Sequence, residues 1–165
     1  MIRVLVVDDD ALVRTGLCLI LESADDIEVV GEAADGLDAV KQVRALTPDV
    51  VLMDVRMPNL DGIAATAQIT GADQNTTRVL VLTTFHLDEY VLGALEAGAS
   101  GFVLKDIPPR ELIEAVRIVH RGDAMLSPQD TRMLIERYAR PEETERRRAA
   151  AEALKQLSPR ELQVA

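Results

Sequence analysis

Five short apolar runs alternate along the chain with segments of helical periodicity, and this alternation most constrains the fold. Four of the runs are rich in Val, Leu and Ile without strict alternation of apolar and polar residues, which is typical of strands buried on both faces of a sheet. The runs are residues 2–7, 28–31 (the weakest), 50–53, 79–83 and 101–104. Strands that alternate with helices in this way predict an α/β fold with a doubly wound sheet of five parallel strands.

Capping residues, prolines and glycines delimit the predicted helices. Asp10, Asp35 and Asp88 each precede a helical pattern, where a short carboxylate can accept hydrogen bonds from the free N–H groups of the first turn. The remaining boundaries are marked by Gly62, Pro108, Pro109 and Gly122. The spacing therefore predicts one helix after each strand.

The composition limits the class of protein and its compartment. Aromatic residues make up only 2% of a chain that is 48% hydrophobic, so the core must be aliphatic. Cys18 is the only cysteine, which excludes an internal disulfide and fits a reducing cytoplasm. The chain starts directly with a strand and contains no stretch as long as a membrane-spanning helix. We therefore expect a cytoplasmic protein without membrane contact.

The net charge of −10 is unevenly distributed. Residues 1–126 contain 21 acidic and 10 basic residues, a net charge of −11, whereas residues 127–165 contain 7 acidic and 8 basic residues, a net charge of +1. The acidic part should repel nucleic acid, so any contact with DNA is expected from the C-terminal side.

The sequence changes character after Gly122. Residues 127–140 have a helical pattern that ends before Pro141, and a helical linker is expected over residues 123–156. Ser158, Pro159 and Glu161 then have the spacing of a capping box, which predicts the start of another helix. Because so short a helix is unstable alone, we expect residues 157–165 to be the truncated start of a further domain.

Carboxylates follow two of the predicted strands. Asp8, Asp9 and Asp10 end the first run, and Asp54 ends the third. In doubly wound folds, ligands bind beyond the carboxyl ends of the strands. A cluster of carboxylates there is costly unless a cation neutralises it, and oxygen ligands with spare water positions suit Mg²⁺. The sequence therefore predicts a magnesium site that serves phosphoryl chemistry.

Further motifs follow the other strands in order. Asp54 begins the run D-x-x-M-P-x-x-D-G, Thr83 ends the fourth strand, and Lys105 ends the fifth. With these features the chain, up to residue 122, strongly resembles the receiver domain of bacterial two-component response regulators. The segments around Lys105-Asp106 and Leu126-Ser127-Pro128 resemble the NarL/FixJ subfamily, in which a LuxR-type helix-turn-helix domain follows.

The resemblance implies a fold and a domain organisation. The fold would be flavodoxin-like, with strand order 2-1-3-4-5. Residues 1–122 would form the receiver domain, residues 123–156 a helical linker, and residues 157–165 the truncated start of the DNA-binding domain.

The resemblance also implies a phosphoacceptor and its metal. Asp54 would accept a phosphoryl group from a sensor histidine kinase. Asp9 and Asp54 would bind Mg²⁺ directly, together with the backbone carbonyl of Arg56, and Asp8 would act mostly through a bound water. Such a protein is not an enzyme in the ordinary sense, although it assists its own phosphorylation and dephosphorylation.

A switch is implied by the same resemblance. Lys105 would pair with the phosphoryl charge, and Thr83 would donate its hydroxyl to a phosphoryl oxygen. Thr83 and Phe102 together would change the surface of the domain, with Phe102 in place of the tyrosine often found there. Arg56 and Phe85 flank the site and are expected to tune the lifetime of the phosphoryl group. Without the resemblance, Phe102 would be interpreted as a core residue.

The implied partners are a sensor histidine kinase, a second copy of the chain and promoter DNA. The homodimer would form through the fourth helix, the fifth strand and the fifth helix. DNA would be bound only through the domain that begins at residue 157, and transcription would be the output.

Two alternatives remain open at this point. Asp8-x-Asp10 after the first strand resembles the nucleophile motif of haloacid-dehalogenase phosphatases, in which Asp8 would be the nucleophile and Asp10 the acid/base. The chain lacks the later acidic pair of such enzymes. The other alternative is an interaction module that keeps the receiver fold without being phosphorylated, and the complete set of acids with Thr83 and Lys105 argues against it.

Overall fold

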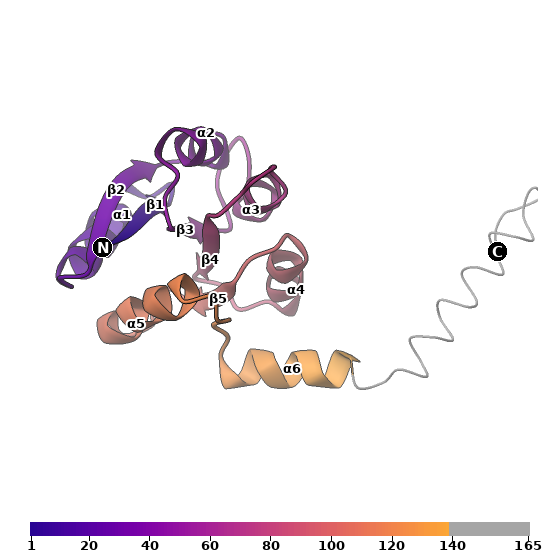
Figure 1. Ribbon diagram of the computed structural model, residues 1–165. Helices are drawn as coiled ribbons and strands as arrows, with labels where there is room; N and C mark the ends of the chain where they lie inside the picture. Colours follow the sequence, from indigo (N-terminus) through magenta and orange to yellow (C-terminus); the bar gives the residue numbers. More distant parts are fainter. Residues whose placement is uncertain (139–165) are drawn as a thin grey trace, which may run out of the picture. The chain divides into compact units, whose positions relative to one another are not determined.

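The computed structural model describes residues 1–138, and its elements follow the predicted alternation (Figure 1). The strands are β1 (Ile2–Val7), β2 (Ile27–Ala33), β3 (Val50–Asp54), β4 (Arg78–Thr83) and β5 (Gly101–Leu104). The helices are α1 (Ala11–Glu22), α2 (Gly36–Leu46), α3 (Gly62–Thr70), α4 (Asp88–Glu96), α5 (Pro109–His120) and α6 (Pro128–Tyr138). The chain divides into two compact units, Met1–Ser127 and Pro128–Ala165.

All five strands pair in parallel in the order β2-β1-β3-β4-β5, which confirms the predicted fold. The chain moves outward from β1 to β2 and then crosses back to β3, so the strand order reverses between β1 and β3. Ligands of doubly wound sheets bind at such a reversal. Strand β2 extends beyond the weak run at residues 28–31. As an edge strand it leaves several side chains partly exposed, so its sequence has no long apolar run.

Helices cover both faces of the sheet (Figure 1). One layer is α1 and α5, and it buries Leu21, Leu112 and Val116 against β1, β3 and β4. The other layer is α2, α3 and α4. Because side chains alternate between the faces of a strand, Phe102 lies on this second face, one residue from Val103 in the α1/α5 core.

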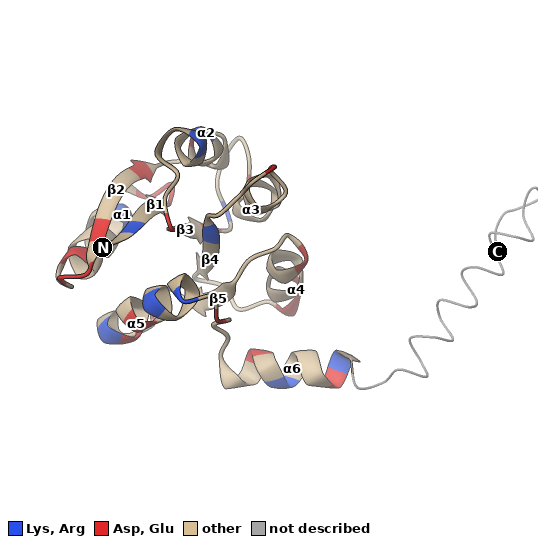
Figure 2. Cartoon of the chain, in the orientation of Figure 1, with Lys and Arg blue, Asp and Glu red and all other residues tan. Residues whose placement is uncertain are grey.

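Charged side chains of both signs lie on the helices that cover the sheet (Figure 2). On α5, Arg110 and Arg117 are interspersed with Glu111 and Glu114. The strand interiors are largely aliphatic, and most of their residues are fully buried. This distribution agrees with the aliphatic core expected from the composition.

The predicted N-caps are confirmed for two helices and wrong for a third. The carboxylate of Asp10 accepts hydrogen bonds from the N–H groups of Leu12 and Val13, and the carboxylate of Asp35 accepts one from Asp38. Asp88, by contrast, is the first residue of α4, and the extended residue before it is Leu87. The carboxylate of Asp88 therefore lies in the first turn, where its charge still favours the helix dipole.

The segment after α5 adds to the edge of the sheet. Gly122 has a φ of +96°, the left-handed conformation that ends α5 as predicted. Met125 then pairs with Gly101, and its carbonyl accepts a hydrogen bond from the N–H of Phe102 at 2.9 Å. The predicted domain boundary at residue 122 stays a prediction.

Helix α6 agrees with the helix predicted over residues 127–140, as far as the structure describes it. The remainder of the predicted linker and the predicted start of a helix-turn-helix domain at residues 157–165 lie outside the described residues. Within residues 1–138, no helix has the length and apolar character needed to cross a membrane.

Candidate cation and phosphoacceptor site

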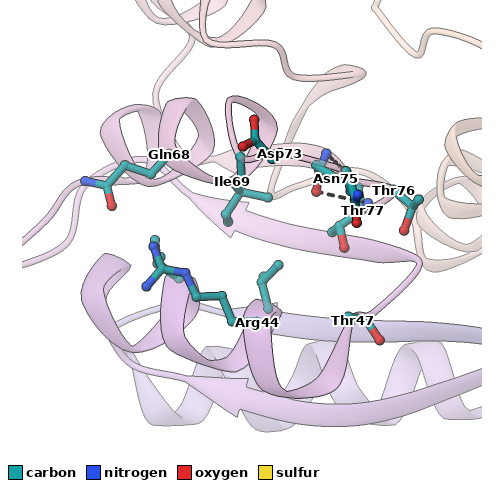
Figure 3. Close-up of a pocket in the computed structure, with 12 residues that line it drawn as sticks. Arg44, Thr47, Gln68, Ile69, Asp73, Asn75, Thr76 and Thr77 are labelled. Atoms are coloured by element: carbon teal, nitrogen blue, oxygen red, sulfur yellow. Dashed lines mark hydrogen bonds between the residues drawn. The ribbon is translucent and has the colours of Figure 1, made fainter.

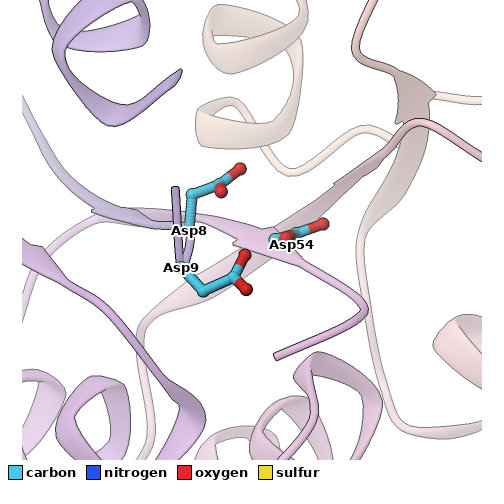
Figure 4. A group of neighbouring side chains, drawn as sticks. All are labelled: Asp8, Asp9 and Asp54. Atoms are coloured by element: carbon cyan, nitrogen blue, oxygen red, sulfur yellow. The ribbon is translucent and has the colours of Figure 1, made fainter. Parts of the chain in front are cut away.

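Strand register brings the predicted carboxylates together at the carboxyl edge of the sheet. Val7 of β1 is paired with Met53 of β3, so the next residues, Asp8 and Asp54, leave the sheet side by side. Oxygen atoms of Asp8, Asp9 and Asp54 all lie within 4.8 Å of one another (Figure 4). The predicted cluster of three carboxylates is therefore present in the folded chain.

The turn between β1 and α1 holds Asp8 in a fixed orientation. Its N–H donates to the carbonyl of Ala33 at 3.1 Å, and its Oδ1 accepts the N–H of Asp10 at 2.9 Å. Asp8 is 1% exposed, whereas Asp9 is exposed. The carboxylate of Asp10 caps α1 and is not among the three clustered ones, which confirms its interpretation as a capping residue.

Lys105 supplies a positive charge to the cluster. Its Nζ lies 2.5 Å from Oδ2 of Asp8 and 3.3 Å from Oδ1 of Asp54. Burial alone would lower the pKa of Lys105, but the bond to Asp8 and the charges of Asp54 and Asp8 outweigh it and raise the pKa. Lys105 thus forms a bridge between two carboxylates. Its predicted pairing with a phosphoryl group stays a prediction.

Asp54 is buried and electrostatically strained. Burial and, second, the nearby charge of Asp8 raise its pKa, Lys105 and the N–H of Val55 lower it, and the net result is a pKa of about 6. That N–H donates to Oδ1 of Asp54 at 2.9 Å. One lysine therefore neutralises this group of acids only in part.

The residues present fit a hard divalent cation. Oδ2 of Asp8 is buried and is paired with the ammonium of Lys105. One lysine shared between two buried carboxylates leaves negative charge uncompensated, which a divalent cation would neutralise. Three carboxylates that include one exposed member leave room for bound water, as Mg²⁺ requires.

Thr83 ends β4 beside this cluster, and its hydroxyl is already engaged. Thr83 is 1% exposed, and its Oγ1 accepts the N–H of Phe85 at 3.3 Å. Its carbonyl accepts the N–H of Lys105 at 2.8 Å, which ties the ends of β4 and β5 together. Phe102 is 1% exposed, so it fills core in this structure, as expected without the resemblance.

The loop from β3 to α3 packs directly against Asp54. Asp61 caps α3 through the N–H of Ala64, and the N–H of Gly62 donates to the carbonyl of Val55 at 2.8 Å. A Cβ at Gly62 would lie 1.8 Å from the carbonyl oxygen of Asp54, so this close approach requires glycine. Gly62 therefore marks the start of α3, as predicted, and Asp61 caps that helix.

Arg56 and Phe85 contact each other from different loops, one after β3 and the other after β4. The guanidinium carbon of Arg56 lies 5.5 Å from the centre of the Phe85 ring, a cation–π contact. The predicted effect of both residues on the lifetime of a phosphoryl group stays a prediction. The role predicted for the carbonyl of Arg56 as a metal ligand stays a prediction.

Arg14 is a residue near the site that the sequence did not single out. Its Nη1 donates to the carbonyl of Asp8 at 2.6 Å, and its Nε donates to Glu32 at 3.3 Å. The only sequence signal was its position four residues after the cap Asp10, on the same side of α1. Sequence spacing does not show that its partner is a backbone carbonyl of the acidic turn.

Neither of two cavities in the described part of the chain is lined by Asp8, Asp9 or Asp54. One of about 130 Å³ lies between α2 and α3, where Thr47 follows α2 and Thr77 precedes β4 (Figure 3). It is therefore at the amino edge of the strands, away from the carboxylates. A second, of about 530 Å³, adjoins the β3–α3 loop and includes Arg56 and Tyr90 in its lining.

A doubly wound sheet with a lysine-bridged acid cluster at its carboxyl edge defines a receiver-type domain. The family model described as the response regulator receiver domain matches residues 4–117, and the chain belongs to that family. Its relatives are response regulators of the NarL and LuxR type.

The relatives include transcriptional regulators. The chain is 36% identical over 163 residues to the oxygen regulatory protein NreC of Staphylococcus epidermidis, covering 98% of this chain and 74% of that protein. It is 44% identical over 126 residues to the transcriptional regulatory protein LiaR of Bacillus subtilis, covering 76% of this chain and 59% of that protein. The chain thus spans only part of the length of these relatives.

A solved structure of a LuxR-family two-component response regulator from Aurantimonas has the same fold. It superimposes with a TM-score of 0.76 at 36% identity, covering 83% of this chain and 97% of that one. The fold and the subfamily expected from the sequence are thereby confirmed.

Proposed function

We propose that Asp54 is the phosphoacceptor of a two-component system and that phosphorylation requires Mg²⁺. The observation that carries the proposal is the placement of Asp8, Asp9 and Asp54 within 4.8 Å, with Lys105 paired to two of them. In the transfer, an Asp54 carboxylate oxygen attacks the phosphorus of a phosphohistidine. The new P–O bond forms as the P–N bond breaks, and the imidazole leaves.

The residues of the chain supply alignment and charge for this step, which phosphoryl transfer mainly needs. Asp9, Asp54 and the backbone carbonyl of Arg56 would hold the cation directly, and Asp8 would act mostly through a bound water. A bound Mg²⁺ would neutralise charge on the phosphoryl oxygens. Lys105 neutralises charge from the other side, since its ammonium already lies 3.3 Å from Oδ1 of Asp54. The N–H of Val55 orients the same oxygen.

The switch follows from the position of the Thr83 hydroxyl. The Thr83 oxygen accepts the N–H of Phe85, so its proton is available to a phosphoryl oxygen, and movement of the side chain toward that oxygen would alter the bond to Phe85. That change would be transmitted to the β4–α4 loop, and Phe102 would repack against α4. One hydrogen bond from Thr83 would thus shift the equilibrium between two conformations of the domain surface.

The partners proposed are a sensor histidine kinase and a second copy of the chain, which would meet the α4–β5–α5 face. Through a LuxR-type domain, phosphorylation would control DNA binding and transcription in the cytoplasm. The printed names of the relatives, which include a transcriptional regulatory protein, support this output.

The phosphatase alternative is not favoured by the site. In such an enzyme Asp10 would be the acid/base, but its carboxylate accepts two N–H groups at the start of α1 and lies outside the cluster. Asp54 would have no role, although it is the carboxylate that burial and Asp8 perturb most clearly.

Intact-mass spectrometry after incubation with acetyl phosphate and Mg²⁺ tests the proposal. We expect a single phosphoryl adduct on the wild type and on Asp61→Asn, which removes an acid from the same loop, and none on Asp54→Asn. An adduct on Asp54→Asn would move the nucleophile to Asp8. If no protein forms an adduct even with a histidine kinase, the chain is a non-phosphorylated interaction module.

A further inference from the structure

We propose that Arg14 of α1 is a positioning residue for the cation site, because its guanidinium holds the turn that carries Asp8 and Asp9. The inference rests on the proposed function and extends it to a residue outside the acid cluster. Arg14 would not touch the cation or the phosphoryl group. It would act through the backbone of Asp8.

The guanidinium bridges two acceptors from different parts of the fold. Nη1 donates to the carbonyl of Asp8 at 2.6 Å, and Nε donates to Oε1 of Glu32 at 3.3 Å. The side chain of Arg14 is 18% exposed and its bond to the carbonyl of Asp8 is partly buried, whereas Glu32 is 49% exposed, so the bond to Asp8 is the sheltered one of the two. A guanidinium presents its donors in a rigid planar fork that fixes the direction of two acceptors at once, whereas a lysine ammonium is a point charge whose donors rotate.

The bond to the carbonyl of Asp8 controls where Asp9 lies. The peptide between Asp8 and Asp9 is planar, so fixing the carbonyl oxygen fixes the whole peptide unit. The other groups of Asp8 are held by Ala33 and Asp10. Asp9 is the exposed member of the cluster, so its direction depends on the backbone that Arg14 holds.

The other end of the bridge is anchored to the sheet. Glu32 belongs to β2 and is paired with Val6 of β1. Its carbonyl accepts Nε2 of Gln42 in α2 at 2.6 Å. Arg14 therefore connects the acidic turn to an element with a fixed register.

Charge and geometry make opposite predictions for Arg14. A positive charge near the cluster repels a cation, so if Arg14 acted by charge alone, its removal would strengthen Mg²⁺ binding. If Arg14 acts by positioning, removal weakens Mg²⁺ binding. Arg14→Lys keeps the charge and loses the fork, so only the positioning role predicts a loss for this variant.

An NMR-detected titration of the whole chain with Mg²⁺ alone tests the inference. The proteins are the wild type, Arg14→Lys, Arg14→Met and the control Arg121→Met. Arg121 follows α5, whose C-terminal end lies at the amino edge of the strands. We expect both Arg14 variants to raise the Kd for Mg²⁺ by about 10–100-fold, the range for residues that orient metal ligands. The control should leave the Kd unchanged.

A second measurement separates positioning from a general loss of stability. The rate of Asp54 phosphorylation by acetyl phosphate is followed as Mg²⁺ increases, for the folded fraction that circular dichroism reports. We expect Arg14→Lys to need more Mg²⁺ for half-maximal rate and to approach the wild-type rate at saturation. A general loss of stability would leave the Mg²⁺ requirement of the folded protein unchanged.

The outcomes separate this inference from the proposed function. A wild type that does not bind Mg²⁺ would overturn the proposed function and the inference with it. If the wild type binds Mg²⁺ and Arg14→Lys binds it equally well, the positioning role is overturned and the proposed function stands. Tighter binding by Arg14→Met would also show that Arg14 acts through charge. Should Arg14→Met fail to fold, the conservative Arg14→Lys decides.

Discussion

At the scale of single residues, the proposed chemistry needs the ionised carboxylate of Asp54, and the fold destabilises that ionised form. Burial and the neighbouring Asp8 raise the pKa of Asp54 to about 6 from its ordinary value of 3.8. The folded state therefore favours the protonated form. Ionised Asp54 lowers the free energy of unfolding. This effect is absent below the pKa of the unfolded state, grows as the pH rises toward about 6, and is complete above that pH.

We predict that Asp54→Asn stabilises the metal-free protein at about pH 8 by about 2 kcal/mol, allowing for the lost contact with Lys105. The gain should fall toward zero as the pH approaches 4, because wild-type Asp54 is then protonated (, roughly pH 4). Urea denaturation in the presence of a chelator measures both values. A variant less stable than the wild type at about pH 8 would contradict the prediction.

Lys105 has the opposite effect on the same cluster. Its side chain is 16% exposed and its ammonium pairs with Asp8 and Asp54, so its loss leaves two buried carboxylates without their cation. We predict that Lys105→Met destabilises the metal-free protein by about 3 kcal/mol at about pH 8. The loss should be smaller at about pH 5, where Asp54 is partly protonated.

The matched control is Lys41→Met, which removes an exposed lysine from α2 and should change stability by no more than about 0.5 kcal/mol. Saturating Mg²⁺ should restore part of the stability that Lys105→Met loses. Equal unfolding free energies for the two variants would show that Lys105 contributes little to the cluster.

At the scale of elements, glycine sets how closely a helix can approach the site. Helix α3 starts at Gly62, whose ideal Cβ would lie 1.8 Å from the carbonyl oxygen of Asp54. Gly16 lies in the interior of α1, where a Cβ would meet nothing within 4 Å. The same substitution should therefore have opposite effects in the two helices.

We predict that Gly62→Ala destabilises the protein by about 3 kcal/mol or more, because backbone must shift to relieve the overlap. Gly16→Ala should stabilise it by about 0.5–1 kcal/mol, since alanine loses less conformational entropy in a helix. Chemical denaturation measures both changes. A neutral Gly62→Ala would show that the β3–α3 loop moves freely relative to Asp54.

At the scale of the whole molecule, β4 and β5 connect the acidic site to α4 and α5. Thr83 contacts the β4–α4 loop through Phe85 and contacts Lys105 through its carbonyl. Phe102 lies on β5, one position from the core of α1 and α5. A shift of the Thr83 hydroxyl would therefore act on the α4–β5–α5 face through the β4–α4 loop and through the bond between Thr83 and Lys105.

We predict that Mg²⁺ with fluoroberyllate, which mimics an acyl phosphate, shifts the wild type toward a dimer in sedimentation velocity. Asp54→Asn should not respond, because the mimic needs the carboxylate. Equal sedimentation of the wild type with and without the mimic would count against self-association as the response. The comparison uses the whole chain.

The amino-acid pattern by itself determined the fold class and most of the site. Apolar runs that end in Asp8 and Asp54 predict parallel strands with acids at one edge, and the caps Asp10 and Asp35 place the helices, because periodicity and capping are local properties. The same reasoning misplaced Asp88 by one residue. It also predicted too short a strand for β2, because partly exposed polar residues interrupt the apolar run there.

Only the tertiary structure decided which groups meet. The register of β1 with β3 brings Asp8, Asp9 and Asp54 within 4.8 Å, and Lys105 is paired with two of them from a distant strand. The raised pKa of Asp54 and the bond from Arg14 to the carbonyl of Asp8 depend on burial and on contacts between elements. Sequence spacing carries no information on those quantities, because they arise when separate segments share one environment.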